Sequence, residues 1–312
     1  MQRKARERHA EAMARGNKPF VGSIVALPTP FRGGSIDECA LAQDIVFHIE
    51  NGTQGLVVGG STGEAASLNM AERQVLWSRA IEAVSGRIPV LLGVGAPSTS
   101  ATLDLARAAV AAGADGLLAV TPYYTVPDAR GLIAHFSALA EAHPDTPILL
   151  YNVPGRTGCD LKPATAHELA DRYDNIVGIK ECTRSIPRIQ ALMGNANLAV
   201  YAGDDLALFD FMRHGAQGAI TVTGNVLPTE TAELIGLASI NPNAKRVADL
   251  ESLLAPVIAA LSLGPNPTPV KAAMEMARNY PGELRLPLLT AEPALRDRIR
   301  TAIAAHVSLQ PV

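Results

Sequence analysis

The sequence is poor in cysteine and has no long apolar runs. Its three cysteines, Cys39, Cys159 and Cys182, lie far apart and lack metal-ligand or disulfide spacing. We interpret them as small core residues of a protein in a reducing cytosol. No apolar run reaches the roughly 20 residues that a membrane-spanning helix requires, so we expect no membrane segment.

Strong charge and several common catalytic motifs are also missing. The formal net charge is −3 and the pI about 6.2, which does not favour nucleic acid or another polyanion as a partner. None of the seven histidines has a second histidine or cysteine at ligand spacing, so we expect no metal centre. There is no Walker A motif, no nucleophile elbow, and no G-x-G-x-x-G after the first apolar run.

Composition and patterning divide the chain into three regions. Residues 1–20 are rich in charge and lack a secretory h-region, so we expect a poorly ordered arm. An amphipathic transit sequence is the alternative, and Glu7 and Glu11 disfavour it. Residues 21–228 alternate short apolar runs with helical patterns. Residues 229–312 contain helical patterns only, which we assign to the last barrel helix and appended helices.

The alternating region predicts a parallel sheet. Its runs are apolar on both faces, as in strands that are covered on both sides. The eight runs are Ser23–Pro28, Gly55–Gly60, Val90–Gly95, Gly116–Thr121, Ile148–Val153, Ile176–Glu181, Ala199–Gly203 and Gly218–Thr223. The expected helices include Asp37–Glu50, Asn69–Val84, Thr99–Ala112, Ala129–Ala142, Pro163–Arg172, Val247–Leu263, Pro269–Asn279 and Pro293–Val307. Eight such units predict an α/β fold, a closed (β/α)8 TIM barrel, and an open doubly wound sheet is the alternative.

One lysine stands out from this pattern. Of the six lysines, only Lys180 ends an apolar run, and we expect the other five to keep their ammonium groups in water. A buried lysine tends to lose its proton, and a neutral amine attacks carbonyl groups to form Schiff bases. The alternative is a lysine paired with a carboxylate at the rim of the sheet.

Other strand ends carry polar groups, and barrel enzymes place their sites there. Ser61 and Thr62 lie in a Gly-rich turn that could bind a carboxylate or phosphate, or could be a simple capped turn. Tyr123 and Tyr124 are adjacent in a chain with only 4% aromatics, and they either pack or offer a phenol.

The next strand ends add a phenol and a cation. Tyr151 is expected at the barrel mouth, and Arg156 follows on a Pro/Gly-rich loop. That arginine either holds a substrate carboxylate or forms a surface salt bridge. Gly203-Asp204-Asp205 ends the seventh run, where a helix N-cap is the plain interpretation. A strand-end lysine, hydroxyls and an arginine together favour imine chemistry on a 2-oxo acid.

Several motifs resemble the dihydrodipicolinate synthase family of pyruvate-dependent aldolases. They are Gly-Ser-Thr-Gly-Glu at 60–64, Val-Thr-Pro-Tyr-Tyr at 120–124, Leu-Tyr-Asn-Val-Pro-Gly-Arg-Thr-Gly at 150–158, Gly-Ile-Lys-Glu at 178–181, Gly-Asp-Asp at 203–205 and Pro-Asn-Pro-Thr-Pro-Val-Lys at 265–271. The resemblance extends from about Gly22 to Ala304. It implies a cytoplasmic lyase of lysine and diaminopimelate biosynthesis that condenses pyruvate with L-aspartate 4-semialdehyde and uses no cofactor beyond the covalent imine.

The resemblance also implies a role for each site residue. Lys180 would form the imine. Tyr151, Ser61 and Tyr124 would form a proton relay, with Tyr124 contributed by a neighbouring subunit of a homotetramer built as a dimer of dimers. The substrate-binding residues would be Thr62 for the pyruvate carboxylate, Arg156 for the semialdehyde carboxylate, and Gly203 and Ile220 for the pocket wall.

Two departures from the family pattern bear on specificity. The relay hydroxyl is usually threonine in the synthases and is Ser61 here, as in the sialate lyase branch. Polar groups that bind the inhibitor lysine in relatives are replaced, and the matching positions here are Ala65, Met70, Arg73, Pro97 and Ala101. We therefore expect weak or absent lysine inhibition. Two alternatives are another pyruvate aldolase, acting on a sugar acid or a 4-hydroxy-2-oxo acid, and a catalytically idle barrel with a binding or regulatory role.

Overall fold

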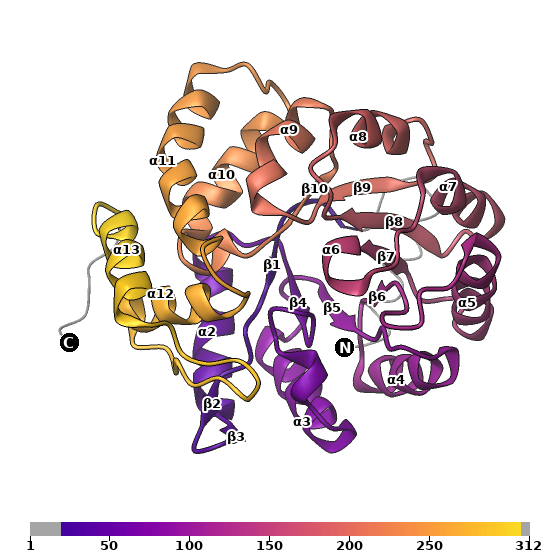
Figure 1. The fold of residues 1–312 in the computed structure, drawn as a ribbon, viewed down its shortest axis with the longest axis horizontal. Helices are drawn as coiled ribbons and strands as arrows, with labels where there is room; N and C mark the ends of the chain where they lie inside the picture. Colours follow the sequence, from indigo (N-terminus) through magenta and orange to yellow (C-terminus); the bar gives the residue numbers. More distant parts are fainter. Residues whose placement is uncertain (1–19, 307–312) are drawn as a thin grey trace.

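Eight parallel strands close into a barrel in this computed structural model, which describes residues 20–306. The strand order around the barrel is β1-β10-β9-β8-β7-β6-β5-β4. Helices surround the strands, as Figure 1 shows. The predicted (β/α)8 barrel is confirmed, and the open doubly wound alternative is wrong. The predicted arm, apart from Phe20, lies outside the described residues.

The strands match the eight apolar runs, but most end one or two residues earlier. The barrel strands are β1 Gly22–Ala26, β4 Gly55–Val58, β5 Val90–Gly93, β6 Gly116–Val120, β7 Ile148–Asn152, β8 Ile176–Glu181, β9 Ala199–Ala202 and β10 Gly218–Thr221. The last predicted residues leave the ladder and begin the βα loops. A short hairpin, β2 Phe31–Arg32 with β3 Ser35–Ile36, was not predicted, since two-residue strands carry no periodicity.

The helices also lie close to their predicted ranges. The α-helices are α2 Glu38–Glu50, α3 Met70–Val84, α4 Thr99–Ala112, α5 Ala129–Ala142, α6 Pro154–Thr157, α7 Pro163–Arg172, α8 Ile186–Met193, α9 Leu208–Arg213, α10 Pro228–Ala238, α11 Lys245–Leu261, α12 Thr268–Arg278 and α13 Pro293–Ile303. Short 3-10 turns are η1 Ala65–Ser67, η2 Asp205–Ala207 and η3 Thr223–Asn225.

Side-chain caps define where several helices begin. Asp37 and Asn69, predicted as first helical residues, are instead N-caps that accept hydrogen bonds from the backbone N–H groups of Ala40 and Glu72. The Glu72 carboxylate in turn accepts a hydrogen bond from the backbone N–H of Asn69, which completes a capping box. An N-cap residue has the composition of a helix start but extended backbone angles. A prediction from sequence therefore counts it as the first helical residue.

The apolar residues form two cores. A large cluster fills the space between the barrel and its helices, and a smaller one fills the barrel interior. Strand β7 divides its side chains accordingly, with Ile148 and Leu150 in the outer core and Leu149 and Tyr151 in the inner core. The inner core therefore leads up to Tyr151 at the C-terminal end of the barrel.

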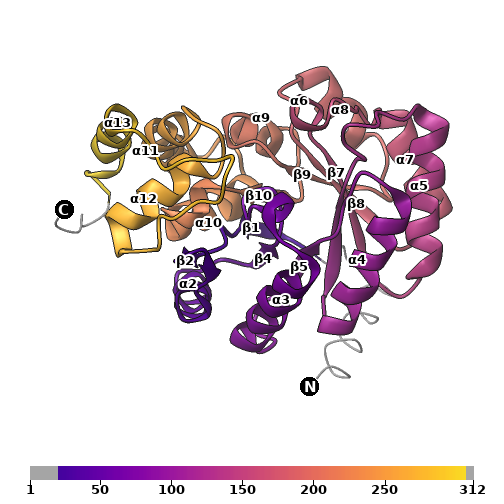
Figure 2. The same cartoon turned by 60° about the horizontal axis from the view of Figure 1, so that its bottom comes forward.

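The appended helices α11, α12 and α13 pack beside the barrel. In Figures 1 and 2 they lie on the side of α2 and α10, away from α5 and α7. Helix α11 packs on α10, and α13 packs on both α11 and α12. The phenol of Tyr280, just after α12, donates to the carbonyl of Pro28 at a distance of 2.9 Å. This contact joins the appended region to the loop after β1.

The cysteine prediction is only partly correct. Cys159 is buried, as expected, but Cys39 is exposed in the first turn of α2. Cys182 is partly buried and packs against the core inside the barrel. The sequence does not distinguish a buried from an exposed cysteine well, because so small a side chain is compatible with either face of a helix or strand.

Candidate active site

A cavity of about 390 Å³ opens at the C-terminal end of the barrel. The loops after β4, β5 and β7 form one part of its wall, and residues 285–288 of the appended region form another. Of the predicted site residues, Ser61, Tyr151 and Arg156 line it. Its position agrees with that of active sites in barrel enzymes.

Lys180 and Tyr151 are neighbours on β8 and β7. The two residues pair in register, and the Lys180 Nζ lies 4.5 Å from the centroid of the Tyr151 ring. Both are nearly enclosed, with 5% and 6% of their surface exposed. Within residues 20–306, Lys180 forms no ion pair, so the paired-lysine alternative does not describe it.

Burial governs the protonation of both groups. Loss of hydration is the largest influence and lowers the pKa of the Lys180 amine; the positive charge of Arg156 adds to this shift, while Cys182, Asp205 and Asp204 partly oppose it. Burial also raises the pKa of the Tyr151 phenol well above its usual value, so this group keeps its proton. The site therefore combines an amine that loses its proton readily with a phenol that holds one, as carbonyl addition requires.

Two further groups contact the Tyr151 phenol. The side chains of Ser61 and Cys182 both influence the pKa of this phenol, which Ser61 lowers and Cys182 raises. Burial raises the pKa of Cys182 to about 12, so it stays a thiol at neutral pH. The Ser61 contact agrees with the predicted relay, whereas Cys182 was expected to be an ordinary core residue. Strand alternation could have indicated this. Cys182 follows Lys180 by two positions, with Glu181 between them, so Cys182 and Lys180 are expected on the same face.

Arg156 is available for an anion. It lies on the one-turn helix α6 where a loop was predicted, and its side chain is exposed at the cavity wall. The described part of the chain offers it no ion pair, so the surface salt-bridge alternative is not supported. An unpaired guanidinium at this position can bind a carboxylate through two parallel N–H donors.

The Ser61–Glu64 turn is held in an unusual backbone conformation. Glu64 has a φ of 52°, in the left-handed region. The hydroxyl of Thr29 donates to the carbonyl of Gly63 at 2.6 Å, and the Asn266 amide donates to the Thr62 hydroxyl at 2.9 Å. Thr62 is buried and does not line the cavity, although Ser61 and Glu64 on either side of it do.

The remaining predicted residues differ in their position. Gly203 lies against Lys180, and a Cβ atom at Gly203 would be 2.7 Å from the Lys180 Cγ, so only glycine fits without displacement. Ile220 belongs to the inner core that includes Tyr151. Tyr124 is 93% exposed and does not line the cavity of its own chain. Asp204 caps η2, which agrees with the N-cap interpretation.

One expectation about the lysines is wrong. Lys271 was expected in water, but its side chain is fully buried in α12. Its Nζ lies 2.5 Å from Glu64 Oε1 and 2.7 Å from the carbonyl oxygen of Glu283. The helical pattern around Lys271 gave no sign of burial, because its carboxylate partner lies 207 residues earlier in the sequence.

The appended region contributes residues that the sequence did not identify as part of the site. Asn266 and Arg285 line the cavity together with Pro265 and residues 286–288. The motif at 265–271 is a family feature, but nothing in it indicated contact with a turn 200 residues away. Only the folded chain brings these residues to the cavity.

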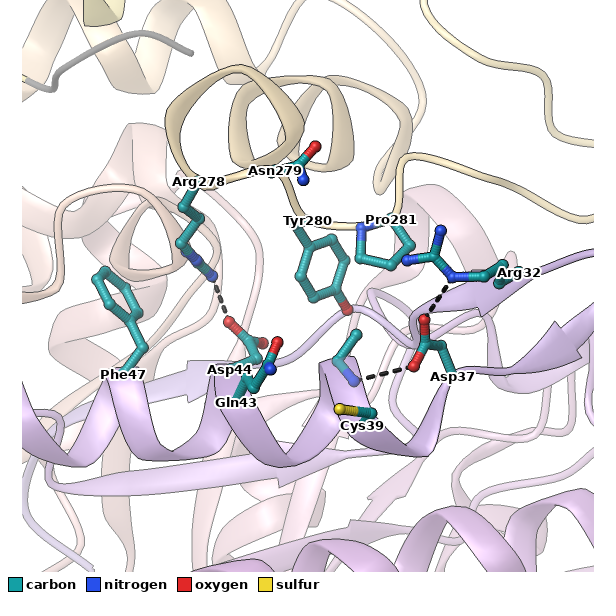
Figure 3. A pocket seen from close by; sticks show the side chains of 11 residues that line it. Arg32, Asp37, Cys39, Gln43, Asp44, Phe47, Arg278, Asn279, Tyr280 and Pro281 are labelled. Atoms are coloured by element: carbon teal, nitrogen blue, oxygen red, sulfur yellow. Dashed lines mark hydrogen bonds and ion pairs between the residues drawn. The ribbon is translucent and has the colours of Figure 1, made fainter.

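A second cavity of about 350 Å³ lies between α2, the β2–β3 hairpin and the end of α12 (Figure 3). Its charged side chains pair with one another, Arg32 with Asp37 and Arg278 with Asp44. We therefore place the chemistry in the first cavity.

In residues 20–306, no cluster of acidic, histidine or cysteine side chains is arranged to hold a metal ion. No helix in that range has the length and apolarity needed to cross a membrane.

Known proteins resemble the chain over nearly its whole length. The model of the "Dihydrodipicolinate synthetase family" matches residues 19–306. A 4-hydroxy-tetrahydrodipicolinate synthase of Teredinibacter turnerae is 43% identical over 287 residues, covering 91% of this chain and 98% of the relative.

Solved structures give the same result. The dihydrodipicolinate synthase of Aquifex aeolicus superposes with a TM-score of 0.90 at 37% identity, covering 94% of this chain and 100% of that one. The enzyme of Acinetobacter baumannii, solved in complex with pyruvate, has a TM-score of 0.87 at 40% identity, with coverages of 91% and 98%. The chain therefore belongs to the dihydrodipicolinate synthase family.

Proposed function

We propose that this protein condenses pyruvate with L-aspartate 4-semialdehyde to give 4-hydroxy-tetrahydrodipicolinate. The observation that carries the proposal is a buried Lys180 without a carboxylate partner, in register with Tyr151. An unpaired Arg156 at the wall of the cavity that Tyr151 also lines adds an anion-binding group. The names of the relatives, and the pyruvate complex of one of them, support the same assignment.

The first step is formation of an imine. The neutral amine of Lys180 adds to the C2 carbonyl of pyruvate, and the carbonyl oxygen leaves as water after it accepts protons. Tyr151 supplies and recovers protons in this step, because its phenol keeps its proton until a stronger base is present. In the proposal, Thr62 and Ser61 hold the pyruvate carboxylate, while Gly203 and Ile220 shape the pocket around it.

The second step joins the two substrates. Loss of a proton from C3 of the imine gives an enamine, whose C3 attacks the aldehyde carbon of the semialdehyde. Arg156 binds the carboxylate of that substrate through its guanidinium fork. The amino group of the semialdehyde then attacks the imine carbon, which closes the ring and releases Lys180. The covalent imine replaces any cofactor in this scheme.

The proton relay is proposed to require a second subunit. Tyr124 is exposed and does not line the cavity of its own chain, which supports a role in a neighbouring copy. We propose a homotetramer built as a dimer of dimers, in which Tyr124 of one subunit completes the relay of another. The free cysteines support action in a reducing compartment such as the cytoplasm.

The experiment that tests the function is a coupled assay. Pyruvate and L-aspartate 4-semialdehyde should give the cyclic product. Polyol aldehydes should condense with pyruvate at least about 10²-fold more slowly, because they have no carboxylate for Arg156, and cleavage of sugar acids or 4-hydroxy-2-oxo acids to pyruvate should be similarly slow. Faster turnover of a sugar acid or a hydroxy-oxo acid would favour another aldolase activity. No turnover of any aldehyde would favour the idle barrel.

We also propose that lysine inhibits this enzyme weakly or not at all. Arg73, at a position that is polar in inhibited relatives, is buried near Tyr123, and among residues 20–306 its hydrogen bonds go to the backbone carbonyls of Leu68, Gly93 and Ala65. A guanidinium there repels the side-chain ammonium of lysine. Initial rates should change by less than about twofold at lysine concentrations near 1 mM. Half-maximal inhibition below that concentration would overturn the proposal.

A further inference from the structure

The segment between α11 and α12 reaches back over the barrel and contacts the turn that carries Ser61 and Thr62. Asn266, in this segment, lines the cavity, and its side-chain Nδ2 lies 2.9 Å from Thr62 Oγ1. The two residues are 204 positions apart in the sequence. The contact joins the appended region directly to a proposed carboxylate-binding residue.

Two further contacts fix the appended region relative to this turn. The Lys271 ammonium binds Glu64 Oε1 at 2.5 Å, and the backbone N–H of Arg285 donates to Glu64 Oε2 at 3.0 Å. The side chains of Lys271 and Glu64 have 0% and 2% of their surface exposed, so this ion pair is shielded from solvent. Asn266 therefore lies close in sequence to Lys271, which binds the same turn of the barrel.

The contact sets the direction of the Thr62 hydroxyl. A threonine hydroxyl can donate one hydrogen bond and accept two. Because the Asn266 amide donates to Thr62 Oγ1, one acceptor position is filled and the O–H proton must point elsewhere. Thr62 is buried beside the cavity wall that Ser61 and Glu64 line, so a proton that points away from Asn266 can reach a carboxylate only if that carboxylate lies against this turn. A carboxylate accepts hydrogen bonds only, so it would accept this proton.

We propose that Asn266 is a positioning residue that directs the Thr62 hydroxyl proton toward the carboxylate of the bound 2-oxo acid. This inference rests on the proposed function, because it assigns that carboxylate to the Ser61–Glu64 turn. The competing interpretation is a purely structural link between the appended region and the barrel. A structural link affects both substrates alike, whereas a positioning residue affects pyruvate selectively.

The test reverses the polarity of the contact. In Asn266→Asp a carboxylate accepts the Thr62 proton and also adds a negative charge near the substrate. The KM for pyruvate should rise about 10- to 100-fold, while kcat and the KM for the semialdehyde change by less than about threefold. Asn266→Ala, which removes the contact without adding charge, should raise the pyruvate KM about 3- to 10-fold. Asn243→Asp adds the same charge at an exposed turn and is the matched control.

A double-mutant cycle with Thr62→Val tests whether Asn266 acts through the Thr62 hydroxyl, and the comparison of the two substrates separates a positioning role from a structural link. Without the hydroxyl, Asn266→Ala should have no further effect on the pyruvate KM. Additive effects, or equal effects on both substrates, would overturn the inference. If Asn266→Asp does not fold, the Asn266→Ala cycle decides alone. Pyruvate trapping in the wild-type protein distinguishes the two levels: no adduct contradicts the proposed function, whereas an adduct with additive mutations contradicts only the role of Asn266.

Discussion

Two buried lysines of this chain have opposite surroundings. Lys271 in α12 contacts the Glu64 carboxylate and a backbone carbonyl, so its charge is compensated. Lys180 in β8 faces the ring of Tyr151 and has no carboxylate partner among the described residues. Burial lowers the pKa of both amines. Glu64 opposes this shift in Lys271 through a direct ion pair, whereas the charges of Asp205 and Asp204 oppose it in Lys180 without an ion pair. We therefore propose that the reactive lysine is the buried one that lacks an ion-pair partner, Lys180, and that Lys271 is structural.

The largest effect should come from removing the unpaired lysine. Lys180→Ala leaves no amine to form the imine, so the condensation rate should fall by more than about 10³-fold. The fold should persist, because the variant loses a costly buried amine and no ion pair. Steady-state rates and the thermal midpoint measure the two effects. Substantial residual turnover would mean that another residue forms the imine.

Removing the paired lysine should have the opposite consequence. Lys271→Met leaves Glu64 buried without its cation, which should cost about 3–5 kcal/mol of unfolding free energy in urea denaturation. The double variant Glu64→Gln/Lys271→Met should recover part of that loss, since no buried charge is left unpaired. Lys245→Met changes an exposed lysine and is the control. A stable Lys271→Met protein would show that the ion pair contributes little.

The anion-binding side of the site can be separated from the imine. Arg156→Ala should reduce kcat/KM for the semialdehyde about 10- to 100-fold, the size expected for one charge-assisted contact. The pyruvate adduct should still form at Lys180, because burial, the largest influence on its pKa, remains when Arg156 is removed. Arg172→Ala removes an arginine of a surface ion pair and provides the baseline. Equal loss of adduct and turnover would place Arg156 in the imine step instead.

The smallest effect concerns a buried base that has no catalytic role. Burial lowers the pKa of His48 to about 4 in the folded protein, below the value of about 6.5 expected when unfolded. The unfolded chain thus binds a proton more readily, and His48 contributes stability above pH 6.5 that is lost as pH falls toward 4. Between pH 8 and pH 5, the unfolding free energy of the His48→Gln variant should therefore fall by about 1–2 kcal/mol less than that of the wild type. Parallel pH dependence of the two proteins in urea denaturation would contradict this.

The sequence predicts the unpaired lysine better than the paired one for a physical reason. Lys180 ends a run of apolar residues, so its burial is a local property of the strand, and Tyr151 ends the preceding strand in the same way. The burial of Lys271 and the contact of Asn266 depend on partners more than 200 residues away. No periodicity in α12 records those contacts, because they arise when the appended region folds over the barrel.

The local rules also explain the smaller errors. A cap such as Asp37 has the composition of a helix start but extended backbone angles, so the boundary shifts by one residue. Cys39 lies in the first turn of α2 on the exposed side, where a small residue carries no signal of its orientation. Cys182 follows Lys180 by two positions, and only strand alternation indicates that it faces the site.

Borohydride reduction in the presence of pyruvate, followed by peptide mass mapping, tests the central claim most directly. Reduction converts the imine into a stable secondary amine on the lysine that formed it. The buried lysine without a carboxylate partner should carry the adduct, so we predict modification of Lys180 and an unmodified Lys271. An adduct on Lys271, or no adduct on either lysine, would contradict the account.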